Sequence, residues 1–492
     1  MVRQVKIAII GAGFAGLAMA AQLVRHGEHD FVLIERADDV GGTWRDNTYP
    51  GAACDIRSDL YSFSFAPNPD WTRRYGRQEE ILDYLRDVTD RFGLRESILF
   101  GTALEHATWD EAGATWAIET TGGPLSAQIL VSGAGPLIEP VWPQIAGLDS
   151  FTGEKFHSAR WNHDVDLRGK RIAVIGTGAS AIQFVPELQK VAGHVTVFQR
   201  TPAWIIPRGD RATTARRREL FRRYPLLQRL SRAWIFRMAE VRFAGFRFAG
   251  VGALFARVAR GFLRSQVADA ELRAKLTPNY RIGCKRILVS SDFYPAMTAS
   301  NVDLVTEGIL RVDGDQIVTA DGAREQFDVI VAGTGFNATR PPIARHITGR
   351  DGVLLADAWS PHMEALRGTT VAGFPNLFVI VGPNTALGHN SIIYIIEAQV
   401  DYIMEALRVM REDAATTIEP SALAQRVYNA RIQAALADSV WVMGGCSSYY
   451  LDDTGTNTAL WPLRAARFRA EVRRLDVREY ALGRGRAATL KE

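Results

Sequence analysis

Two glycine-rich turns, each directly after a short β-branched run, constrain the fold of this 492-residue chain most strongly. The first lies within residues 5–16 (VKIAIIGAGFAG) and the second within residues 171–181 (RIAVIGTGASA). A buried parallel strand that leads into G-x-G-x-x-[GA] and then a helix binds the pyrophosphate of a dinucleotide, because the glycines let the backbone approach it closely. The sequence therefore predicts an α/β protein with two Rossmann-like dinucleotide-binding domains.

The first turn has the features of an FAD site. Its glycines are Gly11, Gly13 and Gly16, and a second strand is expected over residues 31–34. That strand ends at Glu35, whose carboxylate is placed to accept the ribose hydroxyls of an unphosphorylated adenosine. A lone glycine motif would be weak, but the two flanking strands and the terminal acid together predict FAD.

The second turn is predicted to bind NADPH. The strand expected over residues 194–199 ends at Arg200, where the first site has an acid. A cation at that strand end accommodates the 2′-phosphate of NADP, which an acid would repel. A structural salt bridge for Arg200 is the alternative. The residues expected to contact this nucleotide are Thr177, Gly178, Ala179, Ser180, Ala181, Gln183, Arg200 and Thr201.

Ahead of the second turn stands the pattern Phe151-x-Gly153-x-x-x-His157-x-x-x-Trp161. Together with the turn behind it, this pattern resembles the F-x-G-x-x-x-H-x-x-x-W fingerprint of the flavin-dependent (class B) monooxygenases, of the Baeyer–Villiger monooxygenase type. That family usually continues with Pro or Asp, where this chain has Asn162. On the residues alone, the stretch would be an interdomain linker with a packed histidine.

A second resemblance to the family lies near the first turn. Residues 41–44 are GGTW and residues 49–55 are YPGAACD, where the family has G-G-T-W and Y-P-G-A-x-C-D. Adjacent glycines permit the backbone to approach a flat ligand on which an indole could stack, and a glycine-rich surface loop is the alternative. The resemblance implies that these segments lie at the flavin. The residues concerned are Gly42, Thr43, Trp44, Asp55 and Tyr61.

Three later segments extend the resemblance over nearly the whole chain. Residues 333–336 (GTGF) resemble the A-T-G-[FY] signature at which the family returns to its FAD domain. A strand and turn before Asn384 resemble the last FAD contact of the family. Residues 441–461 are rich in Gly, Ser, Thr and Tyr, which suits a mobile loop. In the family such a loop closes over the substrate, and the choice between Tyr449 and Tyr450 stays open.

The resemblance implies a reaction as well as a fold. In the family, NADPH reduces FAD, dioxygen then gives a C4a-peroxyflavin, and its attack on a ketone yields an ester or a lactone. A peroxide anion needs a fixed cation, and Arg286 would supply one because guanidinium stays protonated. Asp55 is expected to pair with Arg286, and Lys285 to face the 2′-phosphate. Two adjacent buried cations should each have an anionic partner.

Two other functions share part of these features. An N- or S-oxidising flavin monooxygenase has both nucleotide sites and the fingerprint, but commonly lacks the aspartate–arginine pair. A membrane-surface flavoprotein that only transfers electrons is disfavoured, because the chain has no redox cysteine pair and no iron–sulfur spacing. We expect a small-molecule ketone as substrate, no metal, no nucleic acid, and either a monomer or a homodimer.

Residues 208–275 differ in composition from the rest of the chain. They hold sixteen arginines and one lysine against five acidic residues, a net charge of +12 in a chain of +4. Amphipathic patterns predict two or three helices in this stretch. Arginines occur in it too often for a transmembrane span. We expect arginine stems to pack on the NADPH domain. The alternative is an anionic membrane surface, and we expect at most weak binding to anionic vesicles.

The motifs divide the chain into domains. The FAD-binding domain is expected over residues 1–145 and 340–492, and the NADPH-binding domain over residues 151–210 and 277–339. The helical insertion spans residues 211–276. Hydrophobic and charged contents of 47% and 23% are those of an ordinary globular protein.

The three cysteines, Cys54, Cys284 and Cys446, lie far apart in the chain. Without a C-x-x-C pair they argue against a disulfide scaffold, a zinc site and a dithiol reductase. The apolar run over residues 5–10 is too short for a signal peptide and leads directly into glycines. A cytoplasmic protein is therefore expected.

Overall fold

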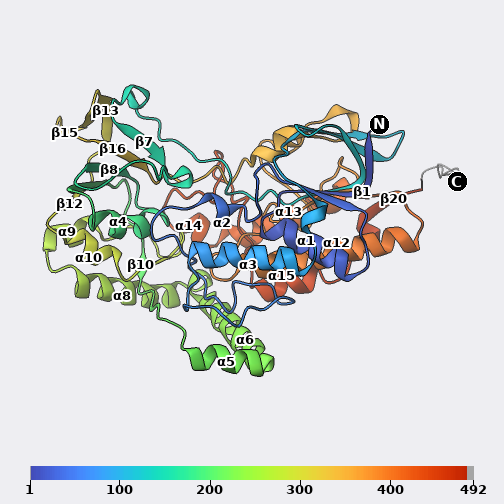
Figure 1. Cartoon of the computed structure of the whole chain (residues 1–492), viewed down its shortest axis with the longest axis horizontal. Coiled ribbons are helices and arrows are strands. Elements are labelled where there is room, and N and C mark those ends of the chain that lie inside the picture. Colours follow the sequence, from blue (N-terminus) through green and yellow to red (C-terminus); the bar gives the residue numbers. More distant parts are fainter. Residues whose placement is uncertain (1, 485–492) are drawn as a thin grey trace.

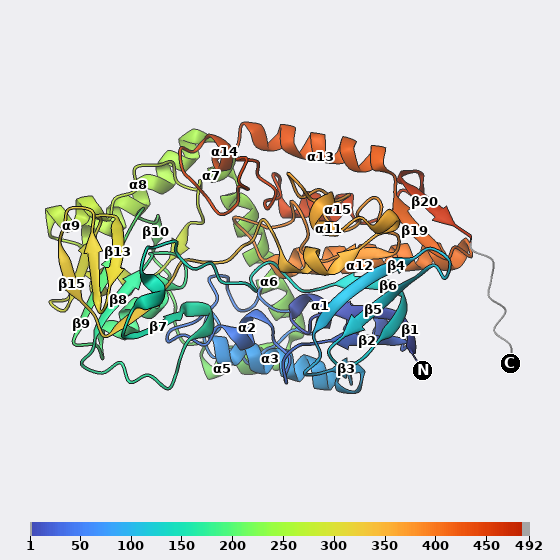
Figure 2. The same cartoon turned by 90° about the horizontal axis from the view of Figure 1, so that it is seen from above.

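The computed structural model describes residues 2–484. The molecule is elongated, with one β-sheet near each end of its long axis (Figure 1). Figure 2 shows the same arrangement from above, with the connecting segments between the two ends. Each sheet carries one of the two glycine-rich turns, so the predicted α/β fold with two Rossmann-like domains is confirmed.

The first sheet has eight strands in the order β17-β4-β5-β6-β1-β2-β3, with β18 also paired to β6. Parallel pairing joins β1 to β2 and β6, whereas β4, β5 and β6 form an antiparallel meander. The strands are β1 (Arg3–Ile10), β2 (Phe31–Ile34), β3 (Ile98–Leu99), β4 (Leu104–Asp110), β5 (Thr115–Thr120), β6 (Leu125–Ser132), β17 (Ile347–Thr348) and β18 (Leu377–Val379). Strands β17 and β18 show that the chain returns to the first sheet after the second domain.

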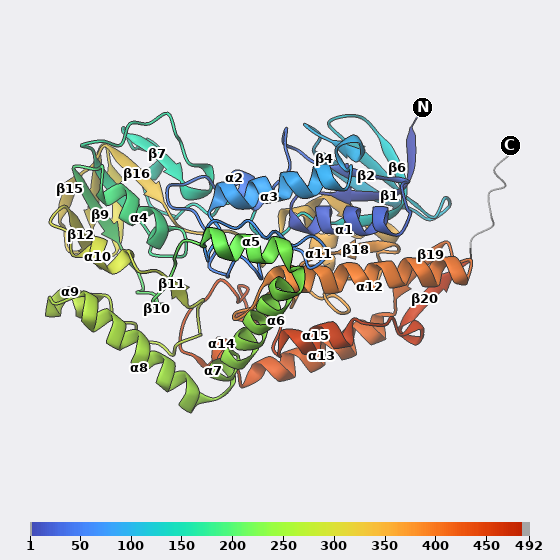
Figure 3. The same ribbon diagram turned by 60° about the horizontal axis from the view of Figure 1, so that its bottom comes forward.

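Helices pack on this sheet, and their apolar side chains form a hydrophobic core with those of its strands. The buried helix α1 (Phe14–Arg25) packs on the long helix α12 (Ile392–Glu412), and Figure 3 shows them side by side. The other helices here are α2 (Thr43–Asp46), α3 (Gln78–Arg91), α11 (Leu355–Ala358), α13 (Ala422–Ala437), α14 (Val440–Met443) and α15 (Ala465–Glu471). A small antiparallel pair, β19 (Thr417–Pro420) with β20 (Tyr480–Gly483), closes the C-terminal end.

The second sheet is wholly parallel, in the order β12-β9-β8-β16-β7. Its strands are β7 (Glu154–His157), β8 (Arg171–Ile175), β9 (His194–Phe198), β12 (Val302–Val305) and β16 (Val329–Ala332). Helices α4 (Ala181–Gln189) and α10 (Phe293–Met297) pack together over it. The remaining strands are β10 (Ile205–Ile206), paired with β11 (Leu288–Val289), and the meander β13 (Ile309–Asp313), β14 (Gln316–Thr319) and β15 (Arg324–Gln326).

The arginine-rich insertion forms five helices rather than the predicted two or three, because two of them are very short. They are α5 (Ala215–Arg223), α6 (Pro225–Arg242), α7 (Ala244–Arg247), α8 (Ala249–Gln266) and α9 (Ala270–Lys275). Figure 3 shows α6 and α8 meeting at α7 as the two arms of a V. Among residues 2–484, no helix is long and apolar enough to cross a membrane.

The insertion packs on the first domain as well as the second, which the sequence did not predict. Arg232 of α6 has 15% of its side chain exposed and donates hydrogen bonds to the backbone carbonyls of Asp59, Leu60 and Ser62. Its guanidinium also lies 3.7 Å from the buried carboxylate of Glu397 on α12. In this position, three carbonyl groups and a carboxylate take the place of the water that would solvate the Arg232 guanidinium. The guanidinium therefore holds α6 against the first domain.

A buried glutamate on α6 makes the second contact between the insertion and the first domain. The Glu240 carboxylate on α6 accepts hydrogen bonds from His389 Nε2 at 3.0 Å, from Asn390 Nδ2 at 2.9 Å, and from the backbone N–H groups of Ala465 and Ala466. Burial by itself would raise the pKa of Glu240. The hydrogen bonds from His389 and Asn390 outweigh burial, so the pKa lies below its usual value.

The Glu240→Ala variant should lose about 3 kcal/mol or more of unfolding free energy, because several buried donors lose their acceptor. Glu240→Gln should lose less. The lowered pKa gives a stabilising contribution that is present above pH 4.5 and lost as the pH falls through the folded-state pKa. Urea unfolding at several pH values measures both effects. Equal stability of Glu240→Ala and the exposed control Glu219→Ala would contradict the assigned role.

Candidate active site

The first turn forms a tight backbone cradle at the end of β1. Gly11 has a φ of +91°, a conformation that favours glycine, and a Cβ on Gly16 would overlap the Gly11 carbonyl oxygen. The backbones of Gly13 and Gly42 approach each other, since a Cβ on Gly42 would lie 3.2 Å from Gly13 Cα. Loop 41–44 therefore lies beside the turn, and the cradle has the shape that a dinucleotide requires.

Glu35 lies at the end of β2, as expected, and is buried. Its carboxylate accepts a hydrogen bond from the Ala12 N–H at 2.8 Å and pairs with Arg45 at 2.9 Å. Burial lowers the pKa of Arg45, but Glu35 and Asp46 outweigh that effect and raise it. The Glu35 carboxylate is thus held against the turn by the Ala12 N–H and by Arg45.

A loop beside this cradle carries an aromatic pair. Trp44 Nε1 donates a hydrogen bond to Tyr61 Oη at 3.1 Å, and the two ring centroids are 5.7 Å apart. The ring of Phe14, at the start of α1, packs edge-on against Tyr61 at 5.2 Å. Burial raises the pKa of Tyr61, so its hydroxyl stays protonated. Thr43 is the first residue of α2 and so stands next to this pair.

The second turn has the same construction. Gly176 has a φ of +107°, and a Cβ there would lie 2.7 Å from the Gly333 carbonyl oxygen. Thr177 Oγ1 donates a hydrogen bond to the Thr201 carbonyl at 3.3 Å, which joins the turn to the end of β9. Gly178, Ala179 and Ser180 follow the turn, and Ala181 begins α4.

A cavity of about 410 Å³ opens at the end of β9. Its lining residues are Gln199, Arg200, Thr201, Pro202, Ala274, Lys275, Thr277, Asn279 and Thr306. The two strand-end residues singled out in the sequence, Arg200 and Thr201, therefore face one cavity together with α9 of the insertion.

Lys285 and Arg200 are two cations without an anionic partner among residues 2–484. The Lys285 ammonium lies over the Tyr280 ring, 5.4 Å from its centroid. Burial, and then the charge of Arg200, lower the pKa of Lys285. We had expected an anionic partner for Lys285, and the described protein supplies none. Two repelling cations beside a cavity suit a phosphate group.

Asp55 and Arg286 form an ion pair across 231 positions of sequence. Arg286 Nε and Nη2 lie 2.7 and 2.6 Å from Asp55 Oδ2, and about a quarter of each side chain is exposed. The charge of Asp55 is the largest cause that raises the pKa of Arg286, and Tyr449 and Tyr450 raise it further. The structure thus places a permanently charged guanidinium beside the loop that carries both tyrosines.

Gln183 has a different environment from the expected one. Its side chain lies on α4 and bridges to the first domain, where its amide bonds both the N–H and the carbonyl of Ala53. Its Oε1 also accepts a hydrogen bond from Tyr49 Oη at 3.1 Å. The amide is occupied by loop 49–53, so Gln183 joins the two domains, a role that no local motif indicates.

The fingerprint residues lie at the junction of the domains. A Cβ on Gly153 would overlap the Asp328 carbonyl oxygen, so only glycine fits there. His157 ends β7 and is almost wholly buried, between the rings of Trp142 at 6.0 Å and Phe336 at 6.2 Å. Burial, and then the charge of Arg160, lower the pKa of His157 to about 4, so the ring is neutral at pH 7. The packed histidine contacts both interdomain linkers.

Asn384 fastens the C-terminal loop. Its Nδ2 donates hydrogen bonds to the carbonyls of Asn457 at 2.8 Å and Leu460 at 3.1 Å. Its Oδ1 is buried and has no hydrogen-bond partner among the described residues. A buried acceptor without a donor is costly, so this oxygen is a candidate contact for a bound molecule.

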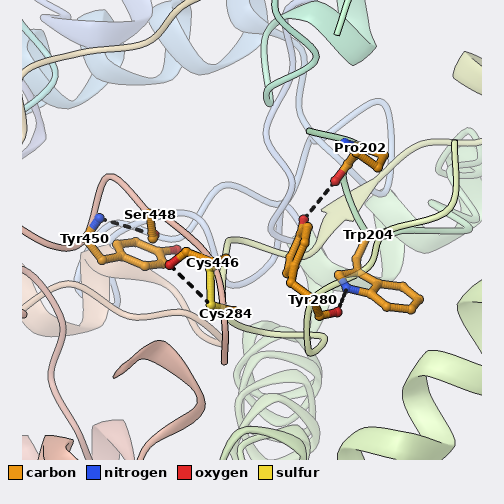
Figure 4. Close-up of a disulfide and its surroundings, with 7 residues drawn as sticks. All are labelled: Pro202, Trp204, Tyr280, Cys284, Cys446, Ser448 and Tyr450. Atoms are coloured by element: carbon orange, nitrogen blue, oxygen red, sulfur yellow. Dashed lines mark hydrogen bonds between the residues drawn. A yellow bond between two sulfur atoms is a disulfide. The ribbon is translucent and has the colours of Figure 1, made fainter. Parts of the chain in front are cut away.

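The cysteine spacing argued against a disulfide scaffold, but the structure pairs two of the three cysteines. Cys284 and Cys446 form a disulfide, shown in Figure 4, between the segment that carries Arg286 and loop 441–461. The two cysteines are 162 positions apart, so spacing could not reveal the contact. Cys54 is the remaining thiol, and burial raises its pKa. Figure 4 also shows Tyr450 beside the disulfide.

Thiol titration tests this pairing. Protein denatured without a reductant should expose one reactive thiol, that of Cys54, and the reduced protein should expose three. The Cys446→Ser variant should expose two thiols without reduction, because Cys284 loses its partner. Three thiols in unreduced wild-type protein would contradict the disulfide.

Comparison with known proteins identifies the family. Residues 4–231 match the FMO-like family of flavin-binding monooxygenases. The chain is 48% identical over 478 residues to a Baeyer–Villiger monooxygenase of Streptomyces coelicolor, covering 97% of this chain and 92% of the relative. It is 47% identical to a Baeyer–Villiger monooxygenase of Pseudomonas aeruginosa, covering 98% and 92%. The chain belongs to the flavin-binding monooxygenases, as its fingerprint predicted.

Solved structures agree with this assignment. A steroid monooxygenase bound to NADP is 31% identical, with a TM-score of 0.87 over 98% of this chain and all of the other. A cyclohexanone monooxygenase from Rhodococcus sp. Phi1 bound to NADP+ is 28% identical, with a TM-score of 0.88 over the same shares. The likeness extends over both domains and the insertion.

Proposed function

We propose that the chain is an NADPH- and O2-dependent FAD enzyme that inserts one oxygen atom beside a ketone carbonyl to give an ester or a lactone. The observation that carries the proposal is the Asp55–Arg286 pair, which provides a fixed cation where loop 441–461 meets the second domain. The two relatives named as Baeyer–Villiger monooxygenases support it, as do the neighbours with NADP bound.

The first cradle would hold FAD. Gly11, Gly13 and Gly16 would let its pyrophosphate approach the start of α1, and Glu35 would accept a ribose hydroxyl. Loop residues would lie along the flavin, with Asn384 Oδ1 as a further acceptor. The loop residues concerned are Gly42, Thr43, Trp44, Asp55 and Tyr61. When bound, the flavin accepts a hydride from NADPH and activates dioxygen.

The second cradle would hold NADPH. Residues Thr177 to Ala181 would surround the pyrophosphate, and the cavity beyond Thr201 would receive the adenosine end. Arg200 and Lys285 would bind the 2′-phosphate, whose charge offsets their mutual repulsion. Gln183 would act through loop 49–53 rather than by direct contact, because its amide is already bonded there.

Arg286 would act on the oxygen-transfer step, with Asp55 as its positioning partner. A guanidinium stays protonated at any relevant pH, so it stabilises developing negative charge without having to gain a proton. Because Asp55 bonds Nε and Nη2 from one side, it holds the plane of the guanidinium in a fixed orientation. Negative charge that develops at the reacting oxygen would meet a cation already in place.

Several finer statements belong to the same proposal. The substrate is a small-molecule ketone, and we propose a monomer or homodimer that acts in the cytoplasm without nucleic acid. The FAD domain would comprise residues 1–145 and 340–492. The NADPH domain would comprise residues 151–210 and 277–339, around the insertion at 211–276. The order in which the strands join the two sheets supports this division.

The cofactor assignment makes a kinetic prediction. The purified protein should contain one FAD, and NADPH should reduce it much faster than NADH. Arg200→Ala should raise the KM for NADPH roughly 10- to 100-fold, the effect of losing one charge-assisted hydrogen bond, and leave NADH kinetics nearly unchanged. Stopped-flow reduction with both nicotinamides measures this. Equal rates of the two in wild-type protein, or an equal loss with NADH in the variant, would contradict it.

The role of Arg286 predicts that its loss separates the two half-reactions. Arg286→Ala should keep FAD reduction by NADPH, whereas ester formation should fall by roughly 100-fold or more. The oxygen consumed should appear as hydrogen peroxide. Arg286→Lys keeps the charge without the planar fork and should recover only part of the activity.

Stopped-flow reduction and product analysis are run on the same variants. The matched control is Arg281→Ala, which removes an exposed arginine from the same segment. Ester formation at the wild-type rate in Arg286→Ala would contradict the role that we propose for Arg286 in oxygen transfer. A fall of equal size in the Arg281→Ala control would show that the effect is not specific to position 286.

A further inference from the structure

Helix α6 has an apolar face that nothing in the described chain covers. Its inner face is buried at Ile235 and Ala239, as in an ordinary amphipathic helix. Its outer face, however, also carries large apolar side chains, and Trp234 is 63% exposed. The exposed apolar residues of α6 are Leu226, Leu227, Leu230, Trp234, Met238 and Val241. A helix on a globular surface normally turns polar residues to the solvent, so this face is unusual.

The exposed residues follow helical periodicity and so form one continuous stripe. Leu226, Leu230 and Trp234 are separated by four residues each, and Val241 follows Trp234 by seven, which returns to the same side of a helix. The stripe runs most of the length of α6. Side chains that line up in this way form a surface instead of isolated exposures.

Helix α8 continues the apolar surface past α7. Phe248, directly before α8, is 62% exposed, and Leu254 and Val258 stand one turn apart on the exposed side. Figure 1 shows α6 and α8 along the same edge of the molecule, opposite β13 and the N-terminus. We name the exposed apolar residues of α6 and α8, together with Phe248, the α6–α8 face.

Unpaired arginines border this face. Six exposed arginines of α6, α7 and α8 form no ion pair or hydrogen bond through their side chains with the described residues: Arg229, Arg237, Arg242, Arg247, Arg257 and Arg264. From Leu220 to Ala268 the only acidic residue is Glu240, which is buried and already bonded. Within residues 220–268, no exposed acidic residue therefore offsets the positive charge beside the apolar side chains.

We infer that the α6–α8 face binds an anionic lipid surface, in place of the at most weak binding to anionic vesicles expected from the sequence. An apolar stripe with Trp and Leu enters the boundary between head groups and acyl chains, while arginines reach the phosphates with their stems along the helix. A second copy of this chain fits poorly, because a two-fold contact through the face would oppose arginine with arginine. The helices would lie on the membrane, since none of those described spans it. This inference does not depend on the proposed function.

The test is co-sedimentation of the full-length holoenzyme with vesicles of stated composition. Phosphatidylcholine vesicles with about 30% phosphatidylglycerol should bind the protein, and phosphatidylcholine alone should bind it at least tenfold more weakly, because the cations near the surface need anionic lipid. Leu230→Ser/Trp234→Ser should reduce binding about tenfold or more, through lost apolar insertion. Arg229→Gln/Arg237→Gln should reduce it roughly 30-fold.

The matched control is Val2→Ser/Leu310→Ser, which removes two exposed apolar side chains from the opposite edge and should leave binding unchanged. Thermal denaturation midpoints of all variants check that they fold. Absence of binding to phosphatidylglycerol vesicles would overturn the inference, as would equal binding by Leu230→Ser/Trp234→Ser and wild-type protein. A dimer in sizing chromatography that this variant abolishes would instead assign the face to a second copy and likewise overturn it.

Discussion

The ion pair between Asp55 and Arg286 is the interaction on which the rest of the site depends. Asp55 belongs to a loop of the first domain, and Arg286 to the segment by which the chain leaves the insertion. Neither group is fully solvated, so each would be costly without the other. The guanidinium is therefore fixed only when the two domains are docked. The fixed charge that we propose for the oxygen-transfer step is in this way a property of the assembled molecule.

The loop that carries Tyr449 and Tyr450 is fastened around this pair at separate points. A disulfide at Cys446 joins it to the segment of Arg286, and Asn384 bonds its far end. Both tyrosines also raise the pKa of Arg286. A loop restrained at both ends has less conformational freedom than one held at a single point. The position of the loop relative to Arg286 is thus set by the disulfide and by the hydrogen bonds of Asn384.

Local patterns predicted the elements well, and long-range contacts poorly. The strands over residues 31–34 and 171–175 have those bounds in the structure, because an apolar run with a glycine turn specifies its own ends. The Cys284–Cys446 bond and the bridge from Gln183 to Ala53 depend on how distant segments meet, which no local period encodes. The family resemblance supplied the pairing of Asp55 with Arg286, which residue types alone left open.

The insertion also shows that local sequence patterns do not predict long-range contacts. The sequence of α6 is apolar on two sides, and periodicity alone does not say which side the protein covers. The structure resolves this, because Arg232 and Glu240 turn one side toward the first domain. Helix α8 instead contacts β10 and α10 of the second domain, where Arg260 stacks on Trp204. The insertion therefore contacts both domains, α6 through buried polar groups and α8 through its packing on β10 and α10.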